Sequence, residues 1–110
     1  MKKIELTTEP ISVNALYTGR RFLTPNGKAT KEAMAWEVKC QWKDEIITEQ
    51  VHVSVVFYLK DNRKDLDGLL KALFDCLTGI VWKDDRQVVG LHAFKRIDKQ
   101  NPRIEIILTI

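Results

Sequence analysis

The chain has 110 residues, of which 45% are hydrophobic and 30% are charged, and its formal net charge is +3. This length suits one domain with a single core, and this apolar content excludes a chain that stays disordered. No apolar run approaches the roughly 20 residues of a membrane-spanning helix, and the charged start Met1–Glu5 disfavours a secretion signal. We therefore expect one domain, over residues 1–110, in the cytoplasm.

The two cysteines, Cys40 and Cys76, each lie within an apolar pattern at helical spacing. Their separation and surroundings predict small reduced core residues, and neither a disulfide nor a metal-binding pair. This also favours a cytosolic compartment.

The first third of the chain predicts short extended pieces followed by a long helix. Residues 3–6 alternate as a strand would, residues 11–16 look like a second extended piece, and residues 17–29 indicate a basic loop or hairpin rich in glycine and proline. A helix is expected from about Thr30 to Ile47, with Thr30 as its N-cap.

The predicted helix over residues 30–47 has two apolar stripes on nearly opposite faces. The stripes comprise Ala35, Val38, Trp42 and Ile46 on one face, and Ala33, Trp36, Cys40 and Ile47 on the other. One face can cover a sheet. The second face is covered either by the rest of this small domain or by a second subunit, and the stripe with Trp36 is the surface that we consider for a dimer.

The remaining elements alternate between strands and a helix. Residues 51–59 alternate strongly and predict a strand, residues 66–77 predict a helix ended by Gly79, and residues 86–96 and 104–110 predict two more strands. The expected order is β-β-α-β-α-β-β. This predicts the α+β class, with a mixed sheet of four to five strands and two helices.

Carboxylates gather in one stretch of this otherwise basic chain. On the predicted helix over residues 66–77, Asp67, Lys71 and Asp75 recur at i, i+4 and i+8 opposite a leucine-rich face, and Asp65 directly precedes the first turn. Asp84 and Asp85 stand where the next strand begins. If helix and strand are neighbours, carboxylates of both segments can converge, and such a cluster persists mainly by binding a cation. Oxygen ligands without histidine or cysteine favour Mg²⁺ or Mn²⁺.

Structural explanations exist for the same residues. Asp65 could be an ordinary N-cap, Asp67 could complement the helix dipole or pair with Lys71 on the surface, and Asp84–Asp85 could form a polar turn. A calcium loop of the EF-hand type is excluded, since its first and twelfth ligand positions would be Arg63 and Phe74. The two histidines, His52 and His92, fit a strand surface or core better than a catalytic site.

Three segments with fixed spacing resemble the signature of the RusA endonucleases, a family of Holliday-junction resolvases. The family signature runs basic-basic-D-x-D-N-x-x-K, then D-x-L, then D-D-x-Q-V. The matching segments here are residues 63–71 (RKDLDGLLK), 75–77 (DCL) and 84–88 (DDRQV). Residues 12–17 (SVNALY) are also similar to the opening of that family.

The resemblance implies a RusA-like fold and a Mg²⁺-dependent endonuclease. Such an enzyme acts as a homodimer and resolves four-way DNA junctions by paired nicks in recombination and repair. Asp65, Asp67 and Asp85 match the essential carboxylates, expected to hold Mg²⁺ or Mn²⁺, and Lys71 matches the essential lysine. Asp75 and Asp84 match positions with a supporting role. A bacterial or prophage origin is also implied.

One departure from the family signature is Gly68, which stands where the family has asparagine and puts metal affinity or rate in question. A catalytically weak junction-binding protein therefore stays open as an alternative. A nuclease for other branched DNA, and a non-enzymatic module whose acidic cluster merely solvates a turn, stay open as well. Basic residues that suit phosphate contacts are Arg20, Arg21, Lys28, Arg63, Lys64, Lys83, Arg86, Lys95 and Arg96.

Overall fold

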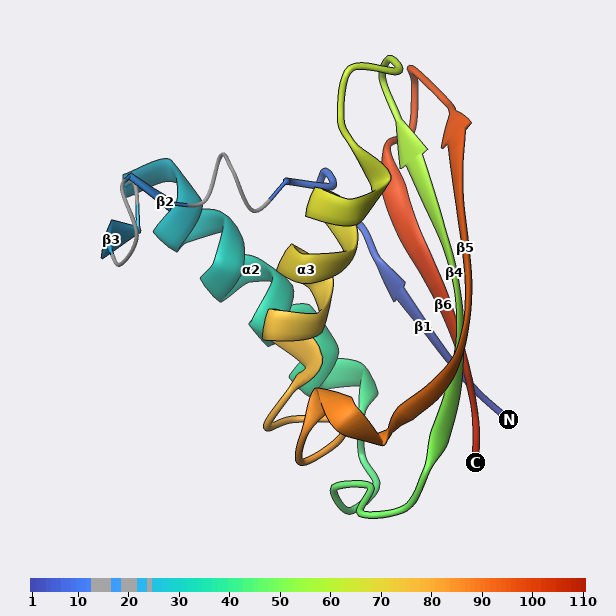
Figure 1. Ribbon diagram of the computed structural model, residues 1–110. Helices are drawn as coiled ribbons and strands as arrows, with labels where there is room; N and C mark the ends of the chain where they lie inside the picture. The colour runs from blue at the N-terminus through green and yellow to red at the C-terminus, as the bar shows by residue number, and fades with distance from the viewer. Residues whose placement is uncertain (13–16, 19–21, 24) are drawn as a thin grey trace.

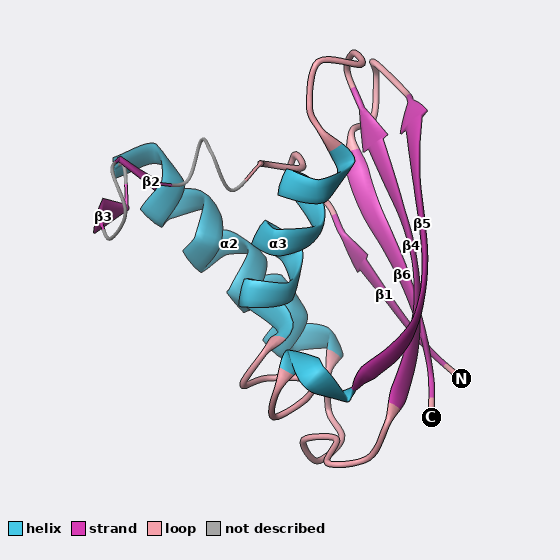
Figure 2. Ribbon diagram, viewed as in Figure 1, coloured by secondary structure: helices cyan, strands magenta, loops and turns pink. Residues whose placement is uncertain are grey.

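The computed structural model describes residues 1–12, 17–18, 22–23 and 25–110, and it places two helices on one face of a four-stranded sheet (Figures 1 and 2). The sheet has the order β1-β6-β4-β5. It consists of β1 (Lys2–Leu6), β4 (Val51–Leu59), β5 (Val88–Ile97) and β6 (Arg103–Thr109). The helices are α2 (Pro25–Gln41) and α3 (Leu66–Leu77). The predicted α+β class is confirmed.

Two smaller elements complete the fold. A hairpin of β2 (Tyr17–Thr18) and β3 (Phe22–Leu23) precedes α2, as the prediction of a loop or hairpin allowed. The short 3₁₀ helix η1 (Asp85–Gln87) leads into β5. No helix in the described part of the chain is long and apolar enough to cross a membrane.

The core forms around β4, whose bounds match the prediction. Its alternate residues from Val51 to Leu59 are buried beneath the helices, whereas His52 and Ser54 are exposed on the other face. β4 pairs in parallel with β5 and antiparallel with β6, so it lies inside the sheet. Because side chains alternate between faces, this pattern buries one row of apolar residues along the whole strand.

The helix α3 also has the predicted bounds. Its buried residues include Leu69, Leu73 and Leu77, which face the sheet. The helix ends at Leu77 with Thr78 as its C-cap, and Gly79 follows with φ +91°, a left-handed conformation that glycine adopts without steric cost. The prediction of a helix ended by Gly79 is confirmed.

The predicted helix over residues 30–47 is wrong at both ends. The helix α2 begins at Pro25, a residue that suits the first helical position because its missing N–H needs no partner there. It ends at Gln41, because the main chain at Ile47 bonds to that of Val81 and Lys83 instead. Thr30 therefore lies inside the helix and is not its N-cap.

The two stripes predicted for this helix are corrected accordingly. Met34, Val38 and Trp42 are buried, whereas Trp36 is 70% exposed. Ile47 is buried and lies outside α2, so it does not belong to the stripe with Trp36. Cys40 is exposed, so its prediction as a core residue is wrong, while Cys76 is buried as predicted. Burial raises the pKa of the Cys76 thiol to about 11, which keeps it protonated.

The strand bounds at the sheet edges shift by one or two residues from the predictions. The expected strand over residues 86–96 begins at Val88, because Arg86 and Gln87 belong to η1. Ile11 and Ser12 are in no strand, and the rest of the predicted extended piece over residues 11–16 lies outside the described residues.

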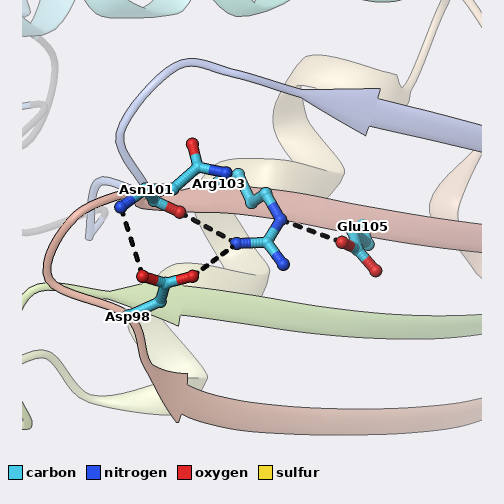
Figure 3. A network of polar contacts seen from close by, with 4 residues as sticks. All are labelled: Asp98, Asn101, Arg103 and Glu105. Carbon is cyan, nitrogen blue, oxygen red and sulfur yellow. Dashed lines mark hydrogen bonds and ion pairs between the residues drawn. The ribbon is translucent and has the colours of Figure 1, made fainter.

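The turn from β5 to β6 is fastened by Arg103, at the start of β6 (Figure 3). Its guanidinium donates hydrogen bonds of 2.9 Å to carboxylate oxygens of Asp98 and Glu105. The same group lies 3.7 Å from the ring centroid of Tyr58 on β4. Ion pairing and a cation–π contact thus join three segments on the face of the sheet that the helices leave uncovered.

Glu37 of α2 joins the helix to the segment after β1. Its carboxylate accepts hydrogen bonds from the backbone N–H and the hydroxyl group of both Thr7 and Thr8. Burial by itself would raise the pKa of Glu37, but these hydrogen bonds outweigh it and lower the pKa below its ordinary value of 4.5. The ionised carboxylate therefore stabilises the folded state.

We predict that Glu37→Gln lowers the free energy of unfolding by about 1 kcal/mol at pH 7, since a charged acceptor is lost. Because the folded pKa is lowered, the stabilisation is complete above pH 4.5 and disappears as the pH falls through the folded pKa. Urea unfolding at pH 7 and at low pH measures the difference. Glu32→Gln, on the exposed side of the same helix, is the control, and an equal loss in both variants would contradict the assignment.

Candidate active site

The first part of the candidate site is the exposed side of α3. Asp67, Lys71 and Asp75 are all exposed there at a spacing of four residues, and the Lys71 Nζ lies 3.6 Å from a carboxylate oxygen of Asp67. Asp65 stands at the N-cap position with extended backbone, yet its side chain makes no capping hydrogen bond. The carboxylate of Asp65 is therefore not used to stabilise the helix end. Gly68, the departure from the family signature, is buried.

The second part of the candidate site is the turn that contains Asp84 and Asp85. The Asp84 carboxylate accepts hydrogen bonds from the backbone and the side chain of Arg86, and the Gln87 side chain accepts one from the Asp84 backbone N–H. The Arg86 guanidinium and its backbone N–H lower the pKa of Asp84 to about 2. Asp84 thus caps η1, while Asp85 is exposed as the first residue of η1.

A shallow open depression of about 480 Å³ lies at the C-terminal end of α3 and joins these two parts. It contains two predicted supporting residues, one predicted catalytic residue and two lysines. Its lining residues are Lys31, Asp75, Thr78, Lys83, Asp84 and Asp85. Lys31 comes from α2 and was missed by the sequence analysis, because no local pattern relates it to the acidic motifs.

The predicted metal ligands are not all brought together within one copy of the chain. Asp65 and Asp67 stand at the start of α3, whereas Asp85 lies beyond its end (Figure 1). A helix of 12 residues is about 18 Å long. Among the described residues, which include all three aspartates, no group of three acidic, histidine or cysteine side chains lies close enough to hold a metal ion.

This separation follows from the strand pairing. β4 and β5 are parallel, so the chain must cross from one end of the sheet to the other between them, and α3 is that crossover. Asp65 follows the end of β4, and Asp85 precedes the start of β5. The two acidic motifs therefore lie at opposite ends of the sheet in one copy.

A second open depression, of about 400 Å³, lies between α3 and β5, and Asp85 belongs to it as well. Phe74 of α3 and Val88, Val89 and Leu91 of β5 supply its apolar part. On the leucine-rich side of α3, Leu66, Leu70 and Phe74 are only partly buried. An apolar surface therefore adjoins the acidic side of α3.

The basic residues predicted for DNA contacts differ in their exposure and in the contacts that their side chains already make within the chain. Lys28, Lys83 and Arg86 are exposed, although Arg86 pairs with Asp84. Arg63 is exposed beside Asp61, but the Lys64 ammonium donates to the Pro10 carbonyl oxygen and so fastens the chain. Arg20 and Arg21 lie outside the described residues.

The last two of these basic residues, Lys95 and Arg96, differ in the same way. The Lys95 ammonium donates a hydrogen bond of 2.9 Å to the Lys64 carbonyl oxygen, whereas Arg96 is exposed on β5. Both histidines, His52 and His92, are exposed on neighbouring strands, so of the two predicted placements, strand surface or core, the structure shows the first.

Comparison with known proteins identifies the family. The family model described as "Endodeoxyribonuclease RusA" matches residues 10–109. The chain belongs to the RusA family. A crossover junction endodeoxyribonuclease RusA of Enterobacteria phage 82 is 32% identical over 105 residues, covering 91% of this chain and 88% of the relative.

Relatives from two bacteria give the same result. The RusA of Escherichia coli K12 is 32% identical over 105 residues, with 91% of this chain and 88% of the relative covered. The RusA of Aquifex aeolicus is 32% identical over 111 residues, with 90% and 85% covered. The resemblance seen in the sequence motifs is thereby confirmed over nearly the whole chain.

We predict that Asp84→Ala lowers the melting temperature, because it removes the cap of η1, whereas Asp85→Ala leaves it unchanged. The pKa of Asp84 is lowered from 3.8 to about 2, so the difference between the variants is complete above pH 3.8 and is lost as the pH falls through 2. Thermal unfolding followed by circular dichroism at several pH values measures it. Equal melting temperatures at pH 7 would contradict the capping role.

Proposed function

We propose that this chain is a Holliday-junction resolvase, an endodeoxyribonuclease that nicks two opposed strands of a four-way DNA junction. The observation that carries the proposal is the RusA family match over residues 10–109. The relatives are named crossover junction endodeoxyribonucleases, and this chain retains the carboxylates and the lysine of the family signature.

The proposed site residues are Asp65, Asp67, Lys71 and Asp85, with Asp75 and Asp84 in support. Exposure of Asp67, Lys71 and Asp85 supports this role, because a DNA phosphate can reach them from solvent. An ammonium at Lys71 would stabilise negative charge that develops on the attacked phosphate. Its ion pair with Asp67 keeps it on the acidic side of α3.

We also propose Mg²⁺, or Mn²⁺ in its place, as the cofactor, held by Asp65, Asp67 and Asp85. The support is the chemistry of the donor set, in which all three ligands are carboxylates. The carboxylates of one copy do not by themselves form such a site, since Asp85 is remote from the other two.

A homodimer suits a junction with near two-fold symmetry, since two identical sites can cut two equivalent strands. DNA phosphates would be contacted by exposed basic residues, of which Lys83 lines the depression at the end of α3 and Arg86 lines the one between α3 and β5. We propose the bacterial cytoplasm as the place of action, supported by the bacterial and phage sources of the relatives.

The test is cleavage of a labelled synthetic four-way junction beside a linear duplex of the same sequence, with Mg²⁺ or with EDTA. We expect paired nicks in the junction alone and none in EDTA. Asp67→Asn should lower the rate of junction cleavage at least about 100-fold, because the proposed Mg²⁺ site loses one of its carboxylate ligands. Glu32→Gln, on the exposed side of α2, is the matched control and should cut at the wild-type rate.

The alternatives make different predictions in the same assay. A wild-type protein that binds the junction but never cuts it, with Mg²⁺ or Mn²⁺, would be a junction-binding protein, and Gly68 would be the residue to replace by asparagine. Faster cutting of forks or flaps than of four-way junctions would indicate a nuclease for other branched DNA. Neither binding nor cutting of any branched substrate would contradict the proposal.

A further inference from the structure

We propose that His52 and His92 together hold one divalent transition-metal ion, such as Zn²⁺, Ni²⁺ or Cu²⁺, on the face of the sheet that the helices leave uncovered (Figure 2). These two residues are the only histidines of the chain. Both side chains are exposed, that of His52 on β4 and that of His92 on β5. Neither residue belongs to the acidic motifs of α3 and η1, and the site needs none of the proposed nuclease chemistry.

The register of the sheet sets the two histidines on the same face as diagonal neighbours. β4 and β5 are parallel, with His52 opposite Gly90 and Ser54 opposite His92. Alternate residues of a strand point to the same face, so both members of each pair share that face with the other pair. The four residues therefore form one patch, and the two histidines occupy opposite corners of it.

Gly90 allows the imidazole of His52 to lie directly on β5. A Cβ atom placed on Gly90 would lie 2.2 Å from Nδ1 of His52 and 3.0 Å from its Cε1, so a side chain at residue 90 and the His52 ring cannot share this space. The His52 ring thus takes the place that a side chain at residue 90 would have. β5 therefore carries two imidazoles on one face, at positions 90 and 92, although only the second comes from its own sequence.

The spacing of these positions suits two ligands of one ion. Positions 90 and 92 stand about 6.6 Å apart along the strand, since each strand residue advances the chain by about 3.3 Å. Two imidazole nitrogens that bind one Zn²⁺ ion at about 2.0–2.1 Å are roughly 3 Å from each other. His92 is exposed on a strand that, in the described part of the chain, pairs only with β4. Rotation of its side chain toward the His52 ring can therefore bring the two nitrogens to this separation.

The surroundings of the pair select the kind of metal ion. The residues opposite the two histidines are Gly90, Ser54 and, on β6, Thr109. None of these three is charged, so they neither repel a cation nor supply the carboxylates that Mg²⁺ and Ca²⁺ prefer. Neutral imidazole is instead a ligand for Zn²⁺, Ni²⁺ and Cu²⁺. The site therefore differs in chemistry from the carboxylate site proposed for Mg²⁺.

Two protein ligands make an open site. A structural zinc site has four protein ligands, whereas no group of three acidic, histidine or cysteine side chains comes together among the described residues. Water would fill the remaining coordination positions of an ion at His52 and His92. We therefore expect reversible binding, with the ion accessible to further ligands from solution.

The first test is NMR of the histidine rings of the full chain during titration with Cu²⁺, a paramagnetic ion of the same ligand class. Two histidines give two imidazole signals, so each can be followed by itself. The Cys40→Ser protein is used because the exposed thiol would compete for the ion, and excess Mg²⁺ is present to occupy carboxylates. Substoichiometric Cu²⁺ should broaden both signals together. Broadening of one signal alone, or of neither, would overturn the proposal.

Titration calorimetry with Zn²⁺ in the same background measures the affinity. We expect one site per chain. His52→Gln and His92→Gln should each weaken binding at least about tenfold, a loss that even an outer contact of a metal ligand can cause. Asp67→Asn is the control and should bind Zn²⁺ as its parent does. Unchanged affinity in both histidine variants, or loss of binding in Asp67→Asn, would place the ion elsewhere and overturn the proposal.

Gly90→Ala tests the position of the His52 ring. The added methyl group would displace the imidazole, so Zn²⁺ should bind at least about tenfold more weakly although both histidines are present. Ser54→Ala, within the same patch, is the matched control and should keep the parent affinity. Circular dichroism checks that each variant is folded, and the two histidine variants decide the case if Gly90→Ala does not fold. Unchanged affinity in a folded Gly90→Ala protein would contradict an ion held between positions 90 and 92.

Discussion

The parallel pairing of β4 with β5 is the constraint on which the rest of this structure depends. Parallel neighbours need a connection that crosses the whole length of the sheet, and here α3 is that connection. The crossover covers one face of the sheet and buries its leucines, which completes the core. It also separates the residues before α3 from those after it, so the acidic motifs of the two segments cannot lie together in one copy.

The end of the crossover is held by a buried tryptophan and by side-chain hydrogen bonds. The Trp82 side chain is fully buried. Its ring packs edge-to-face against that of Phe74, with 5.4 Å between the ring centroids, and its indole N–H donates a hydrogen bond to the Thr78 hydroxyl oxygen. Behind it, Gln87 donates hydrogen bonds to the carbonyl oxygens of Ile47 and Glu49. These contacts position η1, and with it Asp84 and Asp85, against the C-terminal end of α3. Asp65 has no comparable support for its side chain, since its carboxylate makes no capping bond.

The acidic residues differ in what they do in the fold: Asp84 caps η1, whereas Asp67 and Asp85 are exposed and cap no helix. The Asp84 carboxylate accepts hydrogen bonds from the side chain and backbone of Arg86, which lower its pKa, and the Asp84 backbone N–H donates to Gln87. Asp67 is exposed beside Lys71, and Asp85 is exposed on two adjoining depressions. Exposed carboxylates that cap no helix are available for binding or chemistry, and this is the basis on which Asp67 and Asp85 are proposed as site residues.

The sequence by itself determined the elements with strong periodicity and the family. The alternation over residues 51–59 and the leucine pattern over residues 66–77 predicted β4 and α3 to the residue, because burial of one face dictates those patterns. The spaced acidic motifs identified the RusA family, since their residue types and spacing can be read without coordinates.

Only the tertiary structure decided the ends of α2, the exposure of Cys40 and the separation of the acidic motifs. The end of α2 depends on the main-chain bonds between Ile47 and Val81, a contact across the chain that no local pattern reveals. The convergence expected for Asp65, Asp67 and Asp85 depended on whether β4 and β5 are parallel, which periodicity does not report. Strand direction is set by long-range pairing, and that pairing determines which ends of the elements meet.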